Sequence, residues 1–150
     1  MKRDSITKDL FAWEPPAVVR KFEEAEVRAA SLRGRIAKAV AAALKETGKD
    51  RDQVAAEMSA YLAEEVTKNM LDAYASEARE DHTIPYLRLI ALVQVTGDVR
   101  PLQIGAEPVG HSLVEDRYLA AIEDAMFDDK MEEMAQRRRM ARRTWKGARP

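Results

Sequence analysis

The sequence contains no cysteine, so disulfide bonds, thiolate metal sites and cysteine nucleophiles are all excluded. Cysteine-free chains are typical of reducing compartments, and we expect a cytoplasmic protein. Glycine and proline number six each and aromatic residues make up 6% of the chain, which argues against a strand-rich sandwich or barrel. No apolar run approaches the roughly 18 residues of a membrane span, and no signal-peptide pattern is present. We therefore expect no membrane partner.

Catalytic patterns are equally scarce. The two histidines stand far apart, at His82 and His111, and neither has a second histidine at ligand spacing. We expect both in exposed turns or loops. The sequence holds no glycine-rich phosphate loop and no nucleophile elbow. The expected protein is therefore not an enzyme, and it needs no metal or cofactor.

What the sequence does contain favours helices. Apolar residues make up 46% of the 150 residues and charged residues 34%, with 25 basic against 26 acidic side chains. This length and composition predict one compact all-α domain with appendages. We expect an N-terminal arm at 1–16, a helical domain at 17–112, and a long C-terminal helix with a basic tail at 113–150.

The arm combines Phe11 and Trp13 with two successive prolines, which stop a helix. Its aromatic side chains are costly to leave in water, so we expect them docked on the body or on a partner. The following stretch, 17–48, has the apolar spacing of a helix, although Gly34 leaves open whether it is one helix or two.

Capping signals divide the middle of the chain. Asp50 with Gln53 three residues later predicts the start of a helix, and Thr67 predicts the start of another over 68–78. Pro85 suits the first turn of a further apolar helix, which ends at Gly97. The last and longest helical pattern covers 113–146.

Two short helices joined by a turn and backed by a buried helix form the arrangement of helix-turn-helix DNA-binding domains. Ala55 and Ala56 provide the small residues that such a helix crossing needs. The residues themselves, Val54-Ala55-Ala56-Glu57-Met58, Val66-Thr67-Lys68-Asn69-Met70-Leu71 and Ile84-Pro85-Tyr86-Leu87, resemble the lambda-repressor/Cro-type domain over about a third of the chain. As a whole, with its Leu10-Phe11-Ala12-Trp13-Glu14-Pro15-Pro16 opening, the chain looks like small early-region regulatory proteins of Mu-like transposable phages and prophages.

The resemblance implies a set of DNA contacts. It places Thr67, Lys68, Asn69 and Asp72 at the exposed front of the recognition helix, where Asn suits adenine, and Lys suits guanine or phosphate. Arg51 and Lys49, before the first helix, become candidate phosphate contacts. The chain departs from the family in its link, expected over 60–65, which is longer than a tight turn. It also departs in charge, because acidic residues crowd this motif.

The C-terminal segment is the second candidate for nucleic acid. Seven basic residues and no acidic ones follow Ala135, whereas eight acidic residues lie between 115 and 133. The near-neutral net charge of −1 therefore hides a basic end suited to phosphates. The candidate contacts there are Arg137, Arg138, Arg139, Arg142, Arg143 and Lys146. An alternative is antiparallel pairing of acidic and basic portions of neighbouring helices.

The function expected from these features is a DNA-binding regulator of phage or prophage type, acting on duplex DNA as a homodimer. Either the N-terminal helices or residues 113–134 would form the dimer contact. One alternative is a protein-interaction adaptor with the same fold, whose partner is another phage or host protein. The other is an assembly component that binds nucleic acid without sequence preference through its tail.

Overall fold

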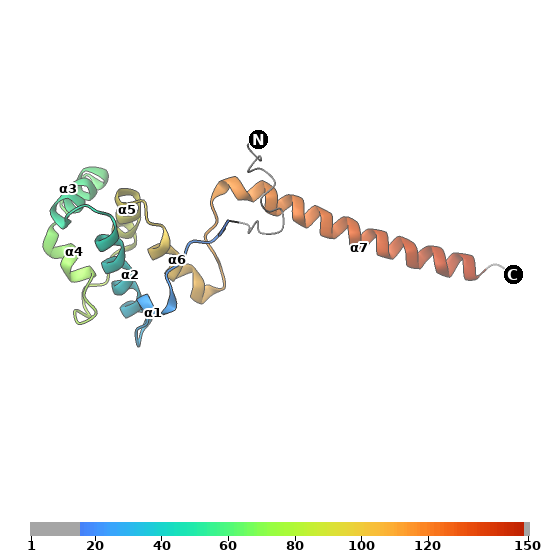
Figure 1. Cartoon of the computed structure of the whole chain (residues 1–150), viewed down its shortest axis with the longest axis horizontal. Helices are drawn as coiled ribbons and strands as arrows, with labels where there is room; N and C mark the ends of the chain where they lie inside the picture. The colour runs from blue at the N-terminus through green and yellow to red at the C-terminus, as the bar shows by residue number, and fades with distance from the viewer. Residues whose placement is uncertain (1–15, 149–150) are drawn as a thin grey trace, which may run out of the picture. The chain divides into compact units, whose positions relative to one another are not determined.

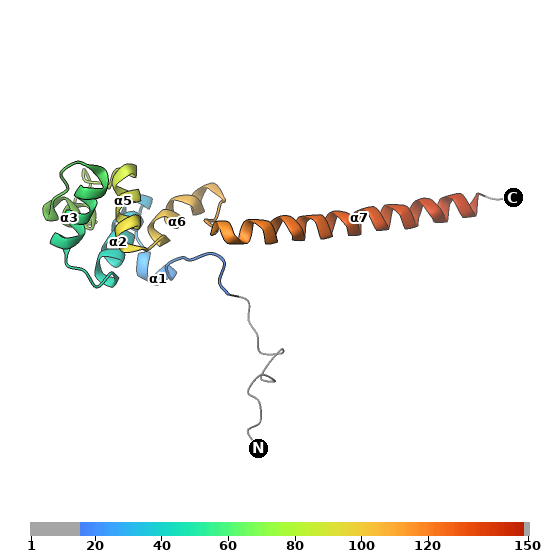
Figure 2. The same ribbon diagram turned by 90° about the horizontal axis from the view of Figure 1, so that it is seen from above.

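The computed structural model describes residues 16–148, and these residues form α-helices, short 3-10 helices and connecting segments, without a strand (Figures 1 and 2). The all-helical fold class is thereby confirmed for this part of the chain, together with the long C-terminal helix. The predicted docking of Phe11 and Trp13 lies outside the described residues. The chain divides into two units between Leu113 and Val114, and each is described by itself.

Helices of the first unit follow one another closely. They are α1 (Glu24–Val27), α2 (Leu32–Glu46), α3 (Arg51–Leu62), α4 (Lys68–Tyr74), α5 (Tyr86–Thr96) and α6 (Arg100–Ala106), followed by the 3-10 helix η2 (Glu107–Val109). In both ribbon views α3 and α4 lie at one end of this unit, while α1 and α6 lie toward the other.

The predicted helix over 17–48 is wrong in its first part. Residues 16–23 are not helical, α1 is only four residues long, and the chain breaks again before Ser31. Ser31 starts α2 by accepting a hydrogen bond from the Gly34 backbone N–H at 3.1 Å. Gly34 also allows a close approach, because a Cβ there would lie 2.9 Å from the Cβ of Ala29. Phe22 and Val27 of this stretch are buried together with Ile104 and Ala39, a tertiary contact that replaces a continuous helix.

Three of the predicted helix ends are confirmed. The Asp50 carboxylate accepts from the Gln53 backbone N–H at 2.8 Å, and the Asp50 backbone N–H donates to the Gln53 side-chain Oε1 at 3.0 Å. The Thr67 hydroxyl caps α4 by accepting from the backbone N–H of Met70. Gly97 ends α5 in the left-handed conformation, with φ of 70°. Side-chain capping and glycine termination thus act where the sequence places them.

The other end of α4 differs from the prediction. The helix stops at Tyr74 instead of continuing to residue 78. After it, the guanidinium of Arg33 donates to the carbonyl oxygens of Glu77 (3.0 Å) and Arg79 (3.3 Å). Those carbonyls bond to α2 instead of continuing the helix, and the segment forms turns through residue 81.

The main core lies among α2, α3, α4 and α5. Met58, Leu71 and Leu92 are completely buried in it. Ala55 is buried at the packing surface of α3, as expected for the helix crossing, but Ala56 is exposed. The remaining buried members of this cluster are Val40, Leu44, Val54, Val66, Tyr74, Ile84 and Ala91.

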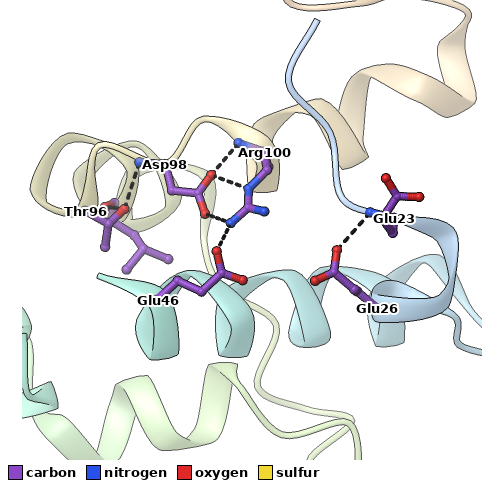
Figure 3. A network of polar contacts seen from close by, with 7 residues as sticks. Glu23, Glu26, Glu46, Thr96, Asp98 and Arg100 are labelled. Carbon is purple, nitrogen blue, oxygen red and sulfur yellow. Dashed lines mark hydrogen bonds and ion pairs between the residues drawn. The ribbon is translucent and has the colours of Figure 1, made fainter. Parts of the chain in front are cut away.

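A polar network joins the end of α5 to α6 and α2 (Figure 3). The carboxylate of Asp98 accepts from the backbone N–H of Arg100 (3.1 Å) and from its guanidinium (2.8 and 2.9 Å). The same guanidinium pairs with Glu46 in the last turn of α2 and lies 4.1 Å from the centre of the Phe22 ring. Arg100 therefore holds three parts of the first unit together.

The second unit consists of the 3-10 helix η3 (Asp116–Tyr118) and α7 (Leu119–Gly147). The long helix starts six residues later than the predicted residue 113, because residues 113–115 are not helical and residues 116–118 form the 3-10 helix η3. None of the residues of α7 is buried. Across the described residues, no helix combines the length and apolar character that a membrane crossing requires.

Candidate nucleic-acid interface

The turn between α3 and α4 is shorter than the sequence predicts. Because α3 continues through Leu62, the link comprises 63–67 instead of inserting residues 60–65. Ala63 ends α3 in the left-handed conformation, with φ of 53°. The link between α3 and α4 is therefore five residues long, one fewer than expected.

Ser59 holds this turn in place. Its hydroxyl accepts a hydrogen bond from the backbone N–H of Val66 at 2.9 Å. The Ser59 Oγ atom lies 2.8 Å from the carbonyl oxygen of Ala55 and 3.1 Å from that of Val66, so the hydroxyl can donate to either. One side chain of α3 therefore fixes the residue just before the N-cap of α4.

The helix α4 has a buried side and an exposed front. Leu71, Ala73 and Tyr74 are buried in the core, so the opposite side is free of packing requirements. Lys68 and Asn69 are exposed at the start of the helix, and Thr67, whose hydroxyl caps the helix, is partly exposed. The structure thus brings three of the predicted base-contacting residues together on one surface.

Asp72 and Arg51, in contrast, form an ion pair with each other. Their side chains are each 37% exposed, and the pair connects the first turn of α3 to α4. Lys49 is held in a similar way. Its ammonium group pairs with Glu57 at 2.6 Å and donates to the carbonyl oxygen of Val95 at 3.0 Å. Both candidate phosphate contacts of the first unit are therefore engaged within it.

Arg88 is a central residue of this region that the sequence did not reveal. From α5 its guanidinium donates to the Tyr74 hydroxyl and, at 3.1 Å, to the carboxylate of Glu64. The hydrogen bonds to Tyr74 and then to Glu64 raise the pKa of Arg88 above its ordinary value despite partial burial. Arg88 thus fixes α4 and the preceding turn onto α5. An arginine interrupting the apolar pattern of 84–95 was the only sequence signal for it.

Acidic side chains surround α4. Glu64 and Glu65 in the turn, and Glu80 and Asp81 after the helix, are exposed. With Arg51, Lys49 and Arg88 all paired to carboxylates, Lys68 is the exposed cation at the front of α4. Repulsion between carboxylates and phosphates disfavours contact with nucleic acid, so this acidic surface by itself is a poor match for DNA.

The second unit carries the other predicted nucleic-acid contacts. The predicted contacts of the tail all lie on α7 and are exposed to solvent: Arg137, Arg138, Arg139, Arg142, Arg143 and Lys146. Arg137 pairs with Glu133 one turn earlier at 3.2 Å, and Lys130 pairs with the same carboxylate at 2.7 Å. The segment 138–146 is thus a basic helical surface without an acidic residue.

The two histidines lie outside this surface. His82 is exposed in the turn after α4, and the Nδ1 atom of His111 lies 2.8 Å from the Val109 carbonyl oxygen. In the part of the chain that is described, no group of three or more acidic or histidine side chains is arranged to hold a metal ion.

Comparisons with models of protein families, with curated proteins and with solved structures found no match for this chain.

Proposed function

We propose that the chain is a cytoplasmic, homodimeric, DNA-binding regulator in which α3 and α4 act as a helix-turn-helix unit. In this proposal the front of α4 enters the major groove of duplex DNA. Lys68 and Asn69 contact base edges, and the basic surface of α7 contacts phosphates. A place in a phage or prophage is proposed from the resemblance of the sequence to early-region proteins of Mu-like phages.

The arrangement of α4 is the observation that carries this proposal. A seven-residue helix packed on α3 and α2, and bonded to α5 through Arg88, keeps Leu71 and Tyr74 inside. It presents Lys68 and Asn69 outward. Exposed Lys and Asn at the front of a second, rigidly held helix are the residue types that contact guanine and adenine edges. The exposed arginines of α7 supply the phosphate attraction that the acidic surroundings of α4 lack.

Fluorescence anisotropy with duplexes selected from a randomised pool tests the proposal. Lys68→Ala combined with Asn69→Ala should erase the preference for selected over random duplexes. Lys45→Ala, at an exposed lysine in the last turn of α2, is the control and should leave that preference unchanged. If the full-length protein binds no duplex even at low salt, the DNA-binding proposal is wrong.

Changes in α7 test the phosphate contacts separately. Replacing Arg139, Arg143 and Lys146 by Gln should weaken binding to selected and random duplexes alike. In a plot of the logarithm of affinity against the logarithm of salt concentration, the negative slope should become shallower by about 0.9 for each phosphate that the variant no longer neutralises. Unchanged affinity and slope would remove α7 from the DNA interface. Binding that depends on α7 alone, without sequence preference, would favour the assembly component.

The exposed carboxylates near α4 support a second candidate, a protein adaptor for a phage or host partner with a basic surface. Glu64 and Glu65 lie in the exposed turn, and the nearby arginines are already neutralised. An arginine-rich model peptide should then bind the full chain, and Glu65→Gln should weaken that binding. Lys68→Ala should not weaken it, which separates this function from DNA binding.

A further inference from the structure

The helix α7 carries a stripe of large apolar side chains that are exposed to solvent in the described part of the chain. Phe127, Met131 and Met134 are 61%, 69% and 61% exposed, although such side chains are normally buried. Their spacing of four and then three residues places them on one side of the helix, and it continues through Arg138, Ala141 and Trp145. Alternation of three and four residues is the pattern of a coiled-coil seam.

Two surface hollows lie along α7. One, of about 370 Å³, is lined by Glu123, Met126, Phe127 and Lys130. The other, of about 360 Å³, is lined by Met131, Met134, Ala135 and Arg138. The stem of Arg138 lines the second hollow, so an arginine in the seam can cover apolar surface while its charged end reaches solvent.

Charge is distributed unevenly along the same helix. The six acidic residues of α7 all precede Met134, and six of its seven basic residues follow it. In a parallel pair of α7 helices, acidic segments would face each other and so would basic segments. An antiparallel pair instead places the acidic segment of each copy beside the basic segment of the other. Exact two-fold symmetry permits this arrangement, because each copy contributes the same surface.

We propose that α7 pairs with α7 of a second copy of this chain as an antiparallel two-helix coiled coil centred near Gln136. In this register Phe127 of one copy packs beside Trp145 of the other, and Met131 packs beside Ala141. The acidic and basic halves then lie side by side over the whole contact. The pairing deepens the dimer of the proposed function, and its tests contain no DNA, so either can fail without the other.

The residues beside the seam agree with this register. Asp128 and Arg142 lie on the same flank of the seam. In the antiparallel pair, Asp128 of one copy therefore approaches Arg142 of the other copy. Within residues 16–148 neither has an ion-pair partner, whereas Lys130 and Arg137 on the other flank both pair with Glu133. In the antiparallel pair, the second copy therefore supplies ion-pair partners for Asp128 and Arg142.

Pairing leaves part of the basic surface available. At 100° per residue, Arg139, Arg143 and Lys146 lie on the side of α7 away from Phe127 and Met134. These three are the residues whose replacement tests phosphate contact above. A dimer held through the seam can therefore still present cations to DNA.

Light scattering coupled to size-exclusion chromatography tests the seam. The full-length protein should elute as a dimer, and Met131→Glu should convert it into a monomer. Met140→Glu is the matched control, because Met140 is 63% exposed but lies half a turn around the helix from Met131. It should leave the dimer intact. A monomeric parent protein, or equal loss of the dimer in both variants, overturns the proposal. Circular dichroism establishes that each variant remains helical.

The absence of native cysteine allows the direction and register to be tested by disulfide formation. Oxidising a mixture of Met131→Cys and Ala141→Cys proteins should give a disulfide between the two variants. Neither variant alone should cross-link, because the two copies of residue 131 then lie about 15 Å apart along the axis, beyond the roughly 7 Å limit of a disulfide. Self-cross-linking of each variant alone would show a parallel pair, and no cross-link in the mixture would exclude this register.

Discussion

Arg51 in the first turn of α3 forms an ion pair with Asp72 of α4. The two residues belong to the surface predicted to contact DNA, yet each satisfies the other. The pair neutralises a cation that would otherwise attract phosphate, and it joins the two helices of the proposed helix-turn-helix unit. The Asp72 carboxylate therefore helps to hold α4 in position, and it also lowers the positive electrostatic potential that Arg51 would produce beside α4.

Removing Asp72 should therefore strengthen DNA binding while costing little stability. We expect Asp72→Ala to increase affinity for duplex DNA, because Arg51 becomes free to contact phosphate. The free energy of unfolding should fall by about 1 kcal/mol or less, since both side chains are more than a third exposed. Anisotropy titrations and urea unfolding measure the two effects. Asp52→Ala changes the net charge equally but leaves the Arg51 pair intact, so an equal gain in that variant would contradict the role of Arg51.

Local signals in the sequence predict much of this fold correctly. Asp50, Thr67 and Gly97 start or end helices in the structure because capping depends on one side chain and its own backbone. The predicted helix over 17–48 failed for the opposite reason. Phe22 and Val27 bury themselves against Ile104, about eighty residues away, and a periodicity pattern contains no information about that contact.

In the candidate site, too, local features could be predicted from the sequence and long-range contacts could not. Exposure of Lys68 and Asn69 follows from the apolar side of α4, which the sequence displays. The pairing of Lys49 with Glu57, and that of Arg88 with Tyr74 and Glu64, depends on where helices meet in space. Long flexible cations can choose among several carboxylates, so their partners could not be assigned before the packing was known.

The Asp98–Arg100 network should make stability depend on pH in acid. Burial raises the pKa of Asp98, but hydrogen bonds from the Arg100 side chain and backbone outweigh it, so the pKa lies below the ordinary 3.8. A lowered folded-state pKa stabilises the protein above the unfolded-state value, and that stability is lost as the pH falls through the folded-state value. The free energy of unfolding should therefore decline below about pH 4. In Asp98→Asn this part of the decline should be absent, which urea unfolding over a pH series measures.

The hydrogen bond between Arg88 and Tyr74 should contribute measurably to stability. Tyr74→Phe keeps the buried ring and removes only the hydroxyl that accepts from Arg88, so we expect a loss of about 1.5 kcal/mol, as for a hydrogen bond to a charged group. Tyr86→Phe removes a hydroxyl from a tyrosine that is 74% exposed and should change stability little. Equal losses in the two variants would show that the Arg88 contact contributes nothing.

Replacing Ala63 by Gly should stabilise the first unit. Ala63 ends α3 with φ of 53°, a left-handed conformation that costs a residue with a Cβ about 1 kcal/mol and costs glycine almost nothing. Because glycine is also more flexible in the unfolded chain, we expect a net gain below 1 kcal/mol in the free energy of unfolding.

Ala60→Gly is the control for this gain. Ala60 is exposed in the last turn of α3, where glycine lowers helix stability by up to about 1 kcal/mol. The two alanine-to-glycine changes, three residues apart, should thus shift the urea midpoint in opposite directions. Destabilisation by both would mean that Ala63 is not left-handed in solution, and the short α3–α4 link that aligns Lys68 and Asn69 would have to be redrawn.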